Sequence, residues 1–421
     1  MRFKSVLILL LCVAVFSVSA QQVNDSLEIE YQKITLIEAV ETAMKNNPNL
    51  TVYKYEIESL EKQKIQAGLI PNPEANFEAE NFLGGKELSG FKGSEYTLSV
   101  SQLFELGGKR RNRIKLAENH VTSSKGEYDL RRIDLIASVK SVYLNLYRIT
   151  KQIELQKQFI KLNEEILATV TRRVEAGRTS PAEESKVKVA LINSRIELDR
   201  LERQSSSASS TLSFLLGTTA RHYEPVFDFY ENIVSLPNRE DVIDSLEQIP
   251  LINIIESERV LRSAKLELEK SHAIPDLTIS GGVRYLNELN TNSFIAGVSM
   301  PIPFFSRNQG NIQSAEVLLQ QVDEIKNARI LSVVSNINSS FNNLLSAYNN
   351  SIRLKEEIIP ESEKAYEITR QGYLQGRFAF IDLLDAQRTL FDTEAQYLLE
   401  LADYYKSLIE LENLTGKTFI K

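Results

Sequence analysis

A heptad repeat between Leu135 and Val174 constrains the fold more than any other feature of the sequence. Spacings of four and three alternate along the seam, and ten of its twelve positions are apolar. The seam comprises Leu135, Val139, Val142, Leu146, Ile149, Ile153, Gln156, Ile160, Asn163, Leu167, Val170 and Val174. A sustained period of 3.5 residues keeps its seam on one side only when the helix supercoils against partners. At about 1.5 Å per residue, this stretch alone predicts a helix of roughly 60 Å.

The first long helix is expected to end at a turn, and a second helix then returns alongside it. The turn spans residues 175–183, where Ser180 before Pro181 is typical of a helix start. Heptad spacing resumes from Val187 to Leu215. Two long helices joined by a short turn predict an antiparallel helical hairpin. Gly126, within a polar part of the first helix, predicts a local irregularity.

Ahead of this hairpin the apolar period changes to two. Short helices are expected over residues 34–47 and 50–67, followed by two alternating runs. The apolar positions of these runs are Ala75, Phe77 and Ala79, then Tyr96, Leu98 and Val100. Runs of about ten residues with one apolar face predict tilted, membrane-spanning β-strands. For a single pair of strands, a hairpin of a soluble protein is the alternative interpretation.

The whole pattern then occurs a second time. Pro48 and Pro250 correspond at an offset of 202, and Gly177 and Gly376 at an offset of 199. The second unit predicts a short helix over 251–270, two strands, a long helix over 309–371 and heptads from 383 to 411. The apolar positions of its two strands are Leu277, Ile279, Val283 and Tyr285, then Phe294, Ala296, Val298 and Met300. The tandem repeats are therefore residues 34–217 and 239–416.

Residues 1–20 have the layout of a secretory signal peptide. Arg2 and Lys4 precede an apolar run, and Ala20 ends a stretch of small residues suited to cleavage. The mature chain, residues 21–421, then lacks cysteine, because Cys12 is the only one in the sequence. Disulfides and thiolate metal sites are excluded. The formal charge of 49 − 56 = −7 argues against a nucleic-acid partner, since phosphate contacts need a basic face.

Four strands per chain imply an oligomer. An open sheet edge cannot face lipid, because its backbone groups would lack hydrogen-bond partners. Three chains would supply 3 × 4 = 12 strands, an even number within the range of known barrels. Helices of sixty-odd residues would extend about 100 Å from these strands. We therefore expect a mainly α fold with a β-barrel portion: a twelve-stranded membrane β-barrel shared by three chains and continuous with a long α-helical coiled-coil barrel.

Several motifs carry a resemblance to a known family. They are residues 68–73 (GLIPNP), 105–110 (ELGGKR) and 301–312 (PIPFFSRNQGNI). With the duplication, they make nearly all of the mature chain similar to the TolC family of trimeric outer-membrane efflux proteins. Particular stretches look like its heavy-metal branch, of the cobalt–zinc–cadmium type.

The resemblance implies a passive exit duct in the outer membrane of a Gram-negative bacterium, reaching into the periplasm. It implies a homotrimer surrounded by outer-membrane lipid, and two protein partners. These are a periplasmic adaptor, or membrane fusion protein, and a proton-driven inner-membrane transporter of the RND type. The cargo it implies is heavy-metal cations.

The resemblance also assigns candidate site residues. Asp382 and Asp385 match an acidic constriction, and three chains would present six carboxylates to the lumen. Helix capping and the helix dipole are the alternative explanation for both residues. Their counterparts in the first repeat, Glu183 and Lys186, depart from a purely acidic ring. At the two turns, the candidate adaptor contacts are Gly177, Arg178, Gly376 and Arg377, with turn formation as the alternative role.

Nothing in the sequence predicts an enzyme, a cofactor or a resident metal. His120, His222 and His272 stand far apart, and no catalytic or phosphate-binding motif accompanies them. Three alternative functions remain open at this stage. Two keep the fold but assign drug efflux or type I protein secretion. The third, of a different class, is a periplasmic coiled-coil adaptor or scaffold, which would have no reason to repeat four amphipathic strands.

Overall fold

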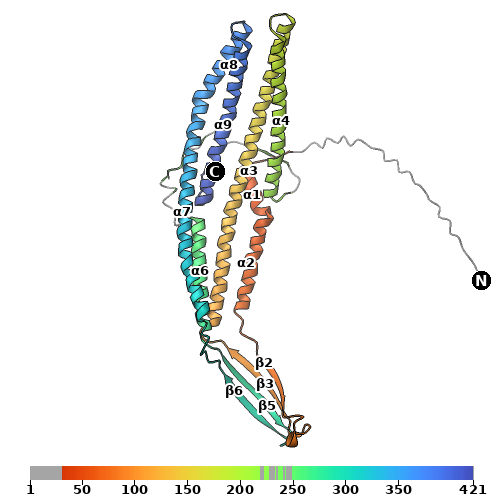
Figure 1. The fold of residues 1–421 in the computed structure, drawn as a ribbon, viewed down its shortest axis with the longest axis vertical. Helices are drawn as coiled ribbons and strands as arrows, with labels where there is room; N and C mark the ends of the chain where they lie inside the picture. The colour runs from red at the N-terminus through yellow and green to blue at the C-terminus, as the bar shows by residue number, and fades with distance from the viewer. Residues whose placement is uncertain are drawn as a thin grey trace, which may run out of the picture.

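The computed structural model describes residues 31–218, 222–226, 233, 236–239, 242 and 249–420. The signal peptide expected at residues 1–20 lies outside the described residues. The molecule is elongated, with a four-stranded sheet at one end and two helical hairpins at the other (Figure 1). Among the described helices, none combines the length and the hydropathy needed to cross a membrane.

The same order of elements occurs twice along the chain. The first set is β1 (Tyr31–Ile34), α1 (Leu36–Asn46), α2 (Pro48–Ala67), β2 (Glu74–Glu80), η1 (Lys86–Leu88), β3 (Glu95–Phe104), α3 (Lys109–Glu175), α4 (Pro181–Leu215) and β4 (His222–Pro225). The second is α6 (Pro250–His272), β5 (Leu277–Leu286), β6 (Thr291–Ser299), α7 (Gln309–Arg353), η3 (Leu354–Ile358), α8 (Ile359–Leu374) and α9 (Phe380–Thr415). In each set, a short helix leads into a strand pair and then into a long helical hairpin.

The four long strands form one antiparallel sheet in the order β2-β3-β5-β6. Its register sets Phe77 opposite Leu98, Leu98 opposite Val283, and Val283 opposite Phe294. The adjoining row, on the other face, consists of Glu78, Thr97, Arg284 and Ser293. One face of the sheet is therefore apolar and the other polar, which confirms the predicted strands and their alternation. Within the described residues, β2 and β6 each leave one edge unpaired.

Two expectations about the long helices are wrong. Helix α3 runs through Gly126 without a break. One glycine costs a helix only about 1 kcal/mol, which the packing of α3 against α6 offsets. The single helix expected over 309–371 is instead divided by the π-helical turn η3. Pro360 follows that turn and lacks the N–H that a regular α-helix would use there.

The short strands β1 and β4 form a parallel pair that the sequence pattern did not predict. The fully buried Tyr143 of α3 anchors this pair, because its hydroxyl lies 2.8 Å from the carbonyl oxygens of both Ile34 and Val226, which share its one proton. The same core includes Tyr404 and Tyr405 of α9. The midsection of the molecule is thus held together by elements from both repeats.

The polar seam positions of α3 form a buried layer. Gln387 of α9 donates to Asn163 Oδ1 at 3.2 Å, and Asn163 donates to Ser194 Oγ of α4 at 3.4 Å. Gln156 donates to the Ser194 carbonyl oxygen at 2.9 Å. Polar groups inside a coiled coil fix the register of its helices, since any slip would leave them without partners. The layer therefore aligns the two hairpins along their length.

Candidate functional site at the hairpin tips

Both hairpins end in the same turn. Gly177 and Gly376 have φ angles of +66° and +78°, and nothing within 4 Å would meet a Cβ at either position. Left-handed backbone, rather than space, therefore requires glycine. The next amide closes the turn in each case, with Arg178 donating to the Arg173 carbonyl oxygen and Arg377 to that of Gly372, both at 2.8 Å.

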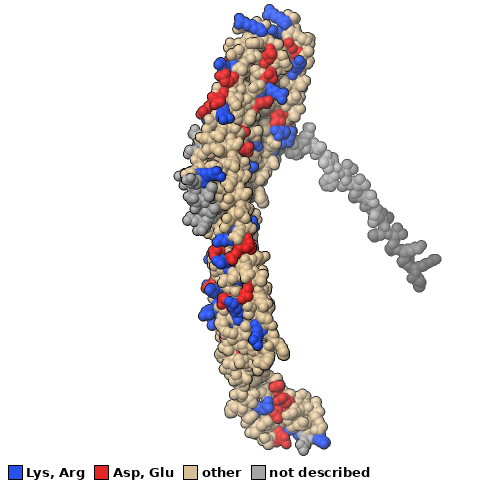
Figure 2. Space-filling model, turned by 60° about the vertical axis from the view of Figure 1, so that its left-hand side comes forward, with Lys and Arg blue, Asp and Glu red and all other residues tan. Residues whose placement is uncertain are grey.

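Arg178 and Arg377 are exposed at the far end of the molecule, where Figure 2 shows Lys and Arg side chains gathered. Below this end, basic and acidic side chains alternate along the hairpins (Figure 2). The structure thus brings the four turn residues expected to contact an adaptor to one accessible surface. It assigns the two glycines a conformational role in addition.

Asp382 and Asp385 lie one turn apart at the start of α9, and both are exposed. The N-cap residue, Ala379, has no polar side chain, and its backbone N–H donates to Asp382 Oδ2 at 2.9 Å instead. Asp382 therefore caps the helix, and it uses one of its two carboxylate oxygens to do so. Neither aspartate forms an ion pair with another described residue. Both negative charges are consequently left uncompensated on the surface of the protomer.

The counterparts in the first hairpin differ in their surroundings. Glu183 is half-buried and accepts a hydrogen bond from Thr179 Oγ1 at 2.5 Å, whereas Lys186 is exposed. Glu184, one residue further on, is paired with Lys188 at 2.8 Å, and that hydrogen bond lowers the pKa of the Glu184 carboxyl. Of the helices that follow the two turns, α9 of the second hairpin is therefore the one that begins with two exposed carboxylates outside any ion pair among the described residues.

Three residues just behind the turns join the two hairpins, and we call them the tip latch: Arg173, Glu183 and Tyr373. Arg173 Nη1 donates to the Tyr373 carbonyl oxygen at 2.9 Å, and the guanidinium carbon lies 4.6 Å from the centre of the Tyr373 ring. The Tyr373 hydroxyl reaches Glu183 Oε2 at 3.5 Å. Burial and the Glu183 carboxylate raise the pKa of Tyr373, so its hydroxyl stays protonated and can donate.

Sequence reasoning missed the tip latch, although a signal was present. Tyr366 and Tyr373 stand seven residues apart, on one side of α8, and Phe380 begins α9 after the turn. All three are buried in a core that joins both hairpins. Behind the turn, a Cβ on Gly372 would lie 2.0 Å from the Phe378 ring, so glycine there admits that ring.

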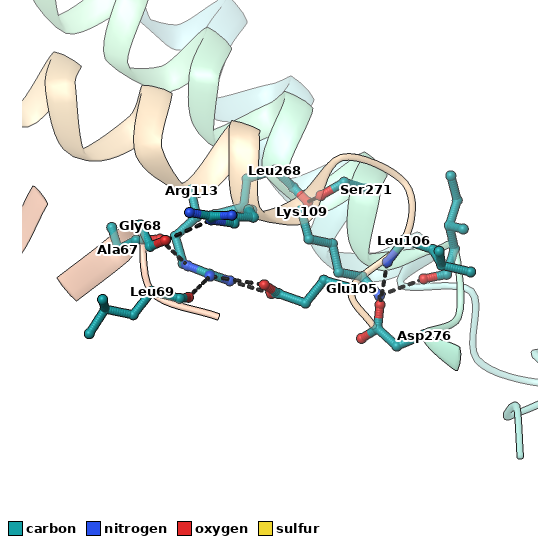
Figure 3. A network of polar contacts seen from close by, with 12 residues as sticks. Ala67, Gly68, Leu69, Glu105, Leu106, Lys109, Arg113, Leu268, Ser271 and Asp276 are labelled. Carbon is teal, nitrogen blue, oxygen red and sulfur yellow. Dashed lines mark hydrogen bonds and ion pairs between the residues drawn. The ribbon is translucent and has the colours of Figure 1, made fainter. Parts of the chain in front are cut away.

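The motifs at the other end of α3 converge on the junction between strands and helices (Figure 3). Lys109 Nζ lies 2.6 Å from both Asp276 Oδ1 and the Ile274 carbonyl oxygen. The backbone N–H of Leu106 donates to the same Asp276 oxygen at 2.9 Å. Gly107 has a φ of +68°, and a Cβ there would lie 2.8 Å from the Ile274 side chain. The turn after β3 is therefore fitted closely against the start of β5.

Two arginines tie this junction to the segment that precedes β2. Arg113 donates to the Ala67 carbonyl oxygen at 2.7 Å and pairs with Glu105 at 2.5 Å, while Arg110 donates to the Gly68 carbonyl oxygen at 2.6 Å. The motifs at 68–73 and 105–110 are thus neighbours in space (Figure 3). Across the described ranges, no group of three or more His, Cys, Asp or Glu side chains is arranged to hold a metal ion.

Comparison with known proteins agrees with this architecture. The sequence matches the family described as outer membrane efflux protein over residues 39–218 and 244–417. It is 30% identical to the cobalt-zinc-cadmium resistance protein CzcC of Cupriavidus metallidurans, over 91% of this chain and 90% of that protein. The cation efflux system protein CusC of Escherichia coli O6:H1 is 20% identical over 90% of this chain and 84% of its own length.

Solved structures show the same fold. A crystal structure of a membrane protein from Pseudomonas aeruginosa superposes with a TM-score of 0.77 at 20% identity, covering 90% of this chain and 92% of that one. A crystal structure of CusC gives a TM-score of 0.76 at 17% identity, covering 91% and 92%.

These matches extend across both repeats, and they confirm the expected mainly helical fold with a β-barrel portion. They favour an outer-membrane channel over a periplasmic adaptor. The expected resemblance to efflux proteins, including relatives of the heavy-metal branch, is likewise confirmed. The chain belongs to the outer membrane efflux protein family, whose members are passive channels of the outer membrane rather than enzymes.

Proposed function

We propose that three copies of this chain form a duct, each contributing four strands to a twelve-stranded barrel and its hairpins to a helical tunnel. The observation that carries the proposal is the sheet, one face of which is apolar and whose β2 and β6 edges are not paired with any other described strand. Closure between copies would pair both edges and present the apolar face to lipid. The tandem repeats at 34–217 and 239–416 would then alternate around the duct.

The cargo we propose is heavy-metal cations. This is supported by the relatives, which are described as cobalt-zinc-cadmium, nickel-cobalt and nickel-cobalt-cadmium resistance proteins. A toluene efflux pump outer membrane protein of Pseudomonas putida is also similar, at 20% identity over 84% of this chain, which keeps drug-like cargo as the second candidate. Growth of a deletion strain in the presence of zinc, cobalt or cadmium, compared with its growth in the presence of toluene, distinguishes the two proposed cargoes.

The partners we propose are a periplasmic adaptor and a proton-driven inner-membrane transporter of the RND type. The exposed turns around Gly177, Arg178, Gly376 and Arg377 would receive the adaptor, because they form the end of the molecule most distant from the sheet. Paired charge reversals at Arg178 and Arg377 should weaken adaptor cross-linking in cells. Unchanged cross-linking would show that the adaptor contacts a part of the protein other than the turns.

We further propose that the second hairpin forms the gate of the duct. Asp382 and Asp385 from three copies would form a ring of six carboxylates that attracts cations and repels anions. The tip latch would hold each second hairpin against its first hairpin and so keep the ring narrow. Opening would then require the contacts among Arg173, Glu183 and Tyr373 to break.

Single-channel conductance in planar bilayers tests the duct and its gate together. Purified wild type should give a small, cation-selective conductance, and Asp382→Ala with Asp385→Ala should raise the conductance while lowering the selectivity. The matched control is Glu316→Ala with Glu324→Ala, which removes the same charge from exposed positions on α7. If the folded, detergent-extracted trimer formed no channel, the proposed duct would be refuted.

A further inference from the structure

The segment that follows β6 exposes more apolar surface than is usual for a turn between a strand and a helix. We call residues 300–308 the exit segment. Within it, the side chains of Ile302, Phe304 and Phe305 are 77%, 75% and 93% exposed. Large apolar side chains in contact with water are unfavourable, and a continuous patch of them marks a surface that something covers.

The segment that precedes β2, at the opposite edge of the sheet, has the same character. We call residues 68–74 the lead-in segment. Leu69 and Ile70 are 52% and 64% exposed there, although the backbone beside them is held firmly. Arg110 and Arg113 of α3 bind the carbonyl oxygens of Gly68 and Leu69, at 2.6 and 3.1 Å. The lead-in segment therefore offers a rigid apolar surface.

The internal repeat supplies a template for how such segments meet. Strand β3 in the first repeat corresponds to β6 in the second, and β2 corresponds to β5. Within one chain β3 pairs with β5, and the turn after β3 contacts the residues before β5. There, Gly107 packs on Ile274, and Lys109 pairs with Asp276 at 2.6 Å (Figure 3). The corresponding pair of edges, β6 and β2, is not paired within the described part of the chain.

Strand direction places the same two segments together between copies. If β6 of one copy pairs antiparallel with β2 of the next, the end of β6 lies at the start of β2. The exit segment then runs beside the lead-in segment. Pro301 and Pro303 follow one strand, while Pro71 and Pro73 precede the other. Since proline cannot donate to a sheet ladder, backbone pairing stops at a similar level on both sides, and side chains must make the contact beyond it.

Charges on the two segments are also complementary. Glu74 corresponds to Asp276 at the offset of 202, is exposed, and forms no ion pair with another described residue. Arg307 is exposed as well, and its Nε donates to the Pro303 carbonyl oxygen at 3.3 Å. Each segment therefore carries one charge that forms no ion pair among the described residues, and the two signs are opposite.

We propose that the exit segment of each copy docks on the lead-in segment of its neighbour. Ile302 and Phe304 would cover the partner subunit's Ile70, and Arg307 would pair with Glu74 of the partner subunit. The contact repeats between chains the junction that joins β3 to β5 within one chain, with Arg307 in place of Lys109. This inference rests on the proposed trimer, and it names the contact that secures barrel closure at the base of the helices.

Disulfide cross-linking tests the docking directly, because the only native cysteine, Cys12, lies in the segment expected to be removed. Two double variants cover the choice of register: Ile70→Cys with Phe304→Cys, and Leu69→Cys with Ile302→Cys. After oxidation of purified protein, we expect covalent trimers that a reductant returns to monomers. The matched control is Ile70→Cys with Phe294→Cys, because Phe294 is as exposed but lies well inside β6, beyond disulfide reach.

A charge exchange tests the ion pair. Arg307→Glu should lower the temperature at which the trimer dissociates, and adding Glu74→Arg should restore it. If native mass spectrometry shows a trimer but neither cysteine pair forms a cross-link, the proposed docking is wrong and the proposed duct still stands. A protein that is monomeric throughout would overturn the proposed trimer as well.

A single tryptophan distinguishes protein from lipid as the covering surface, since the sequence contains no tryptophan. In vesicles that contain brominated lipids, the fluorescence of Phe304→Trp should be quenched weakly if the exit segment docks on protein. The control, Phe294→Trp, reports the apolar face of the sheet and should be quenched strongly. Equal, strong quenching of both variants would assign the exit segment to lipid and refute the docking.

Discussion

Replacing Arg173 should shift the duct toward its open state. In Arg173→Leu the hydrogen bond to the Tyr373 carbonyl oxygen, at 2.9 Å, and the stacking of the guanidinium on the Tyr373 ring are both lost. A hydrogen bond from a charged donor contributes about 1.5–3 kcal/mol, and a cation–π contact at a partly exposed site adds about 0.5–1 kcal/mol. Because the side chain is half-buried, we expect the lower part of this range, about 2 kcal/mol per chain.

That free energy corresponds to roughly a 30-fold change in the ratio of open to closed states per chain, at 1.4 kcal/mol for each factor of ten. Open probability in planar bilayers is the readout. Arg172→Leu is the matched control, because it makes the same change one residue earlier, where Nε donates only to its own helix, at the Ala168 carbonyl oxygen. Equal open probabilities for both variants would refute the assignment of Arg173 to a closing contact.

Three further predictions concern the stability of the helical body. Tyr143→Phe should lower the free energy of unfolding by about 1 kcal/mol in urea titrations, because the Val226 carbonyl loses its hydroxyl donor while the Ile34 carbonyl keeps the Val226 N–H at 3.0 Å; an unchanged free energy of unfolding would contradict this. Lys140→Met should cost about 3–5 kcal/mol, since it leaves Glu412 buried without its cation, whereas wild-type stability would argue against a strong pair. Burial, followed by repulsion from Glu363, raises the pKa of Glu394 above 4.5. The stability that Glu394 contributes to the second hairpin should therefore be present below pH 4.5 and be lost as pH rises through the higher folded-state pKa, as measured by the difference in hydrogen exchange between wild type and Glu394→Gln, which should lack this contribution.

The long helices could be predicted because their signal is local and repeated many times. Heptad spacing places α3, α4 and α9, and the turn glycines bound the hairpins. The alternation of apolar residues likewise identified all four strands of the sheet. By contrast, β1 and β4 have four residues each, too few for any periodicity, and they pair across the chain. The π-helical turn before Pro360 also escaped prediction, since a proline inside a helix can be accommodated in several ways.

The residues of the candidate site also differ in how far the sequence could predict them. The turn residues could be placed at the hairpin ends, and Asp382 and Asp385 at the start of α9, because each belongs to a short contiguous motif; their roles stay predictions. The contact of Arg173 could not be predicted, because its partner, Tyr373, lies 200 positions later and in the other hairpin. The polar seam residue Asn163 posed the same difficulty, since its role depends on Gln387. Contacts between the repeats decide these roles, and a pattern read along one stretch does not contain them.

The buried polar layer has a consequence for how the protein is made. Asn163 and Gln387 are separated by 224 positions in the chain, and α3 packs along α9 as well as along α4. While the polypeptide is still being synthesised and exported, the first hairpin exists before α9 does, so part of its seam remains open to water. Long-range contacts of this kind form late and leave apolar surface exposed to aggregation. The two halves of this duplicated chain therefore do not fold independently, and the first must be kept from misassociating until the second arrives.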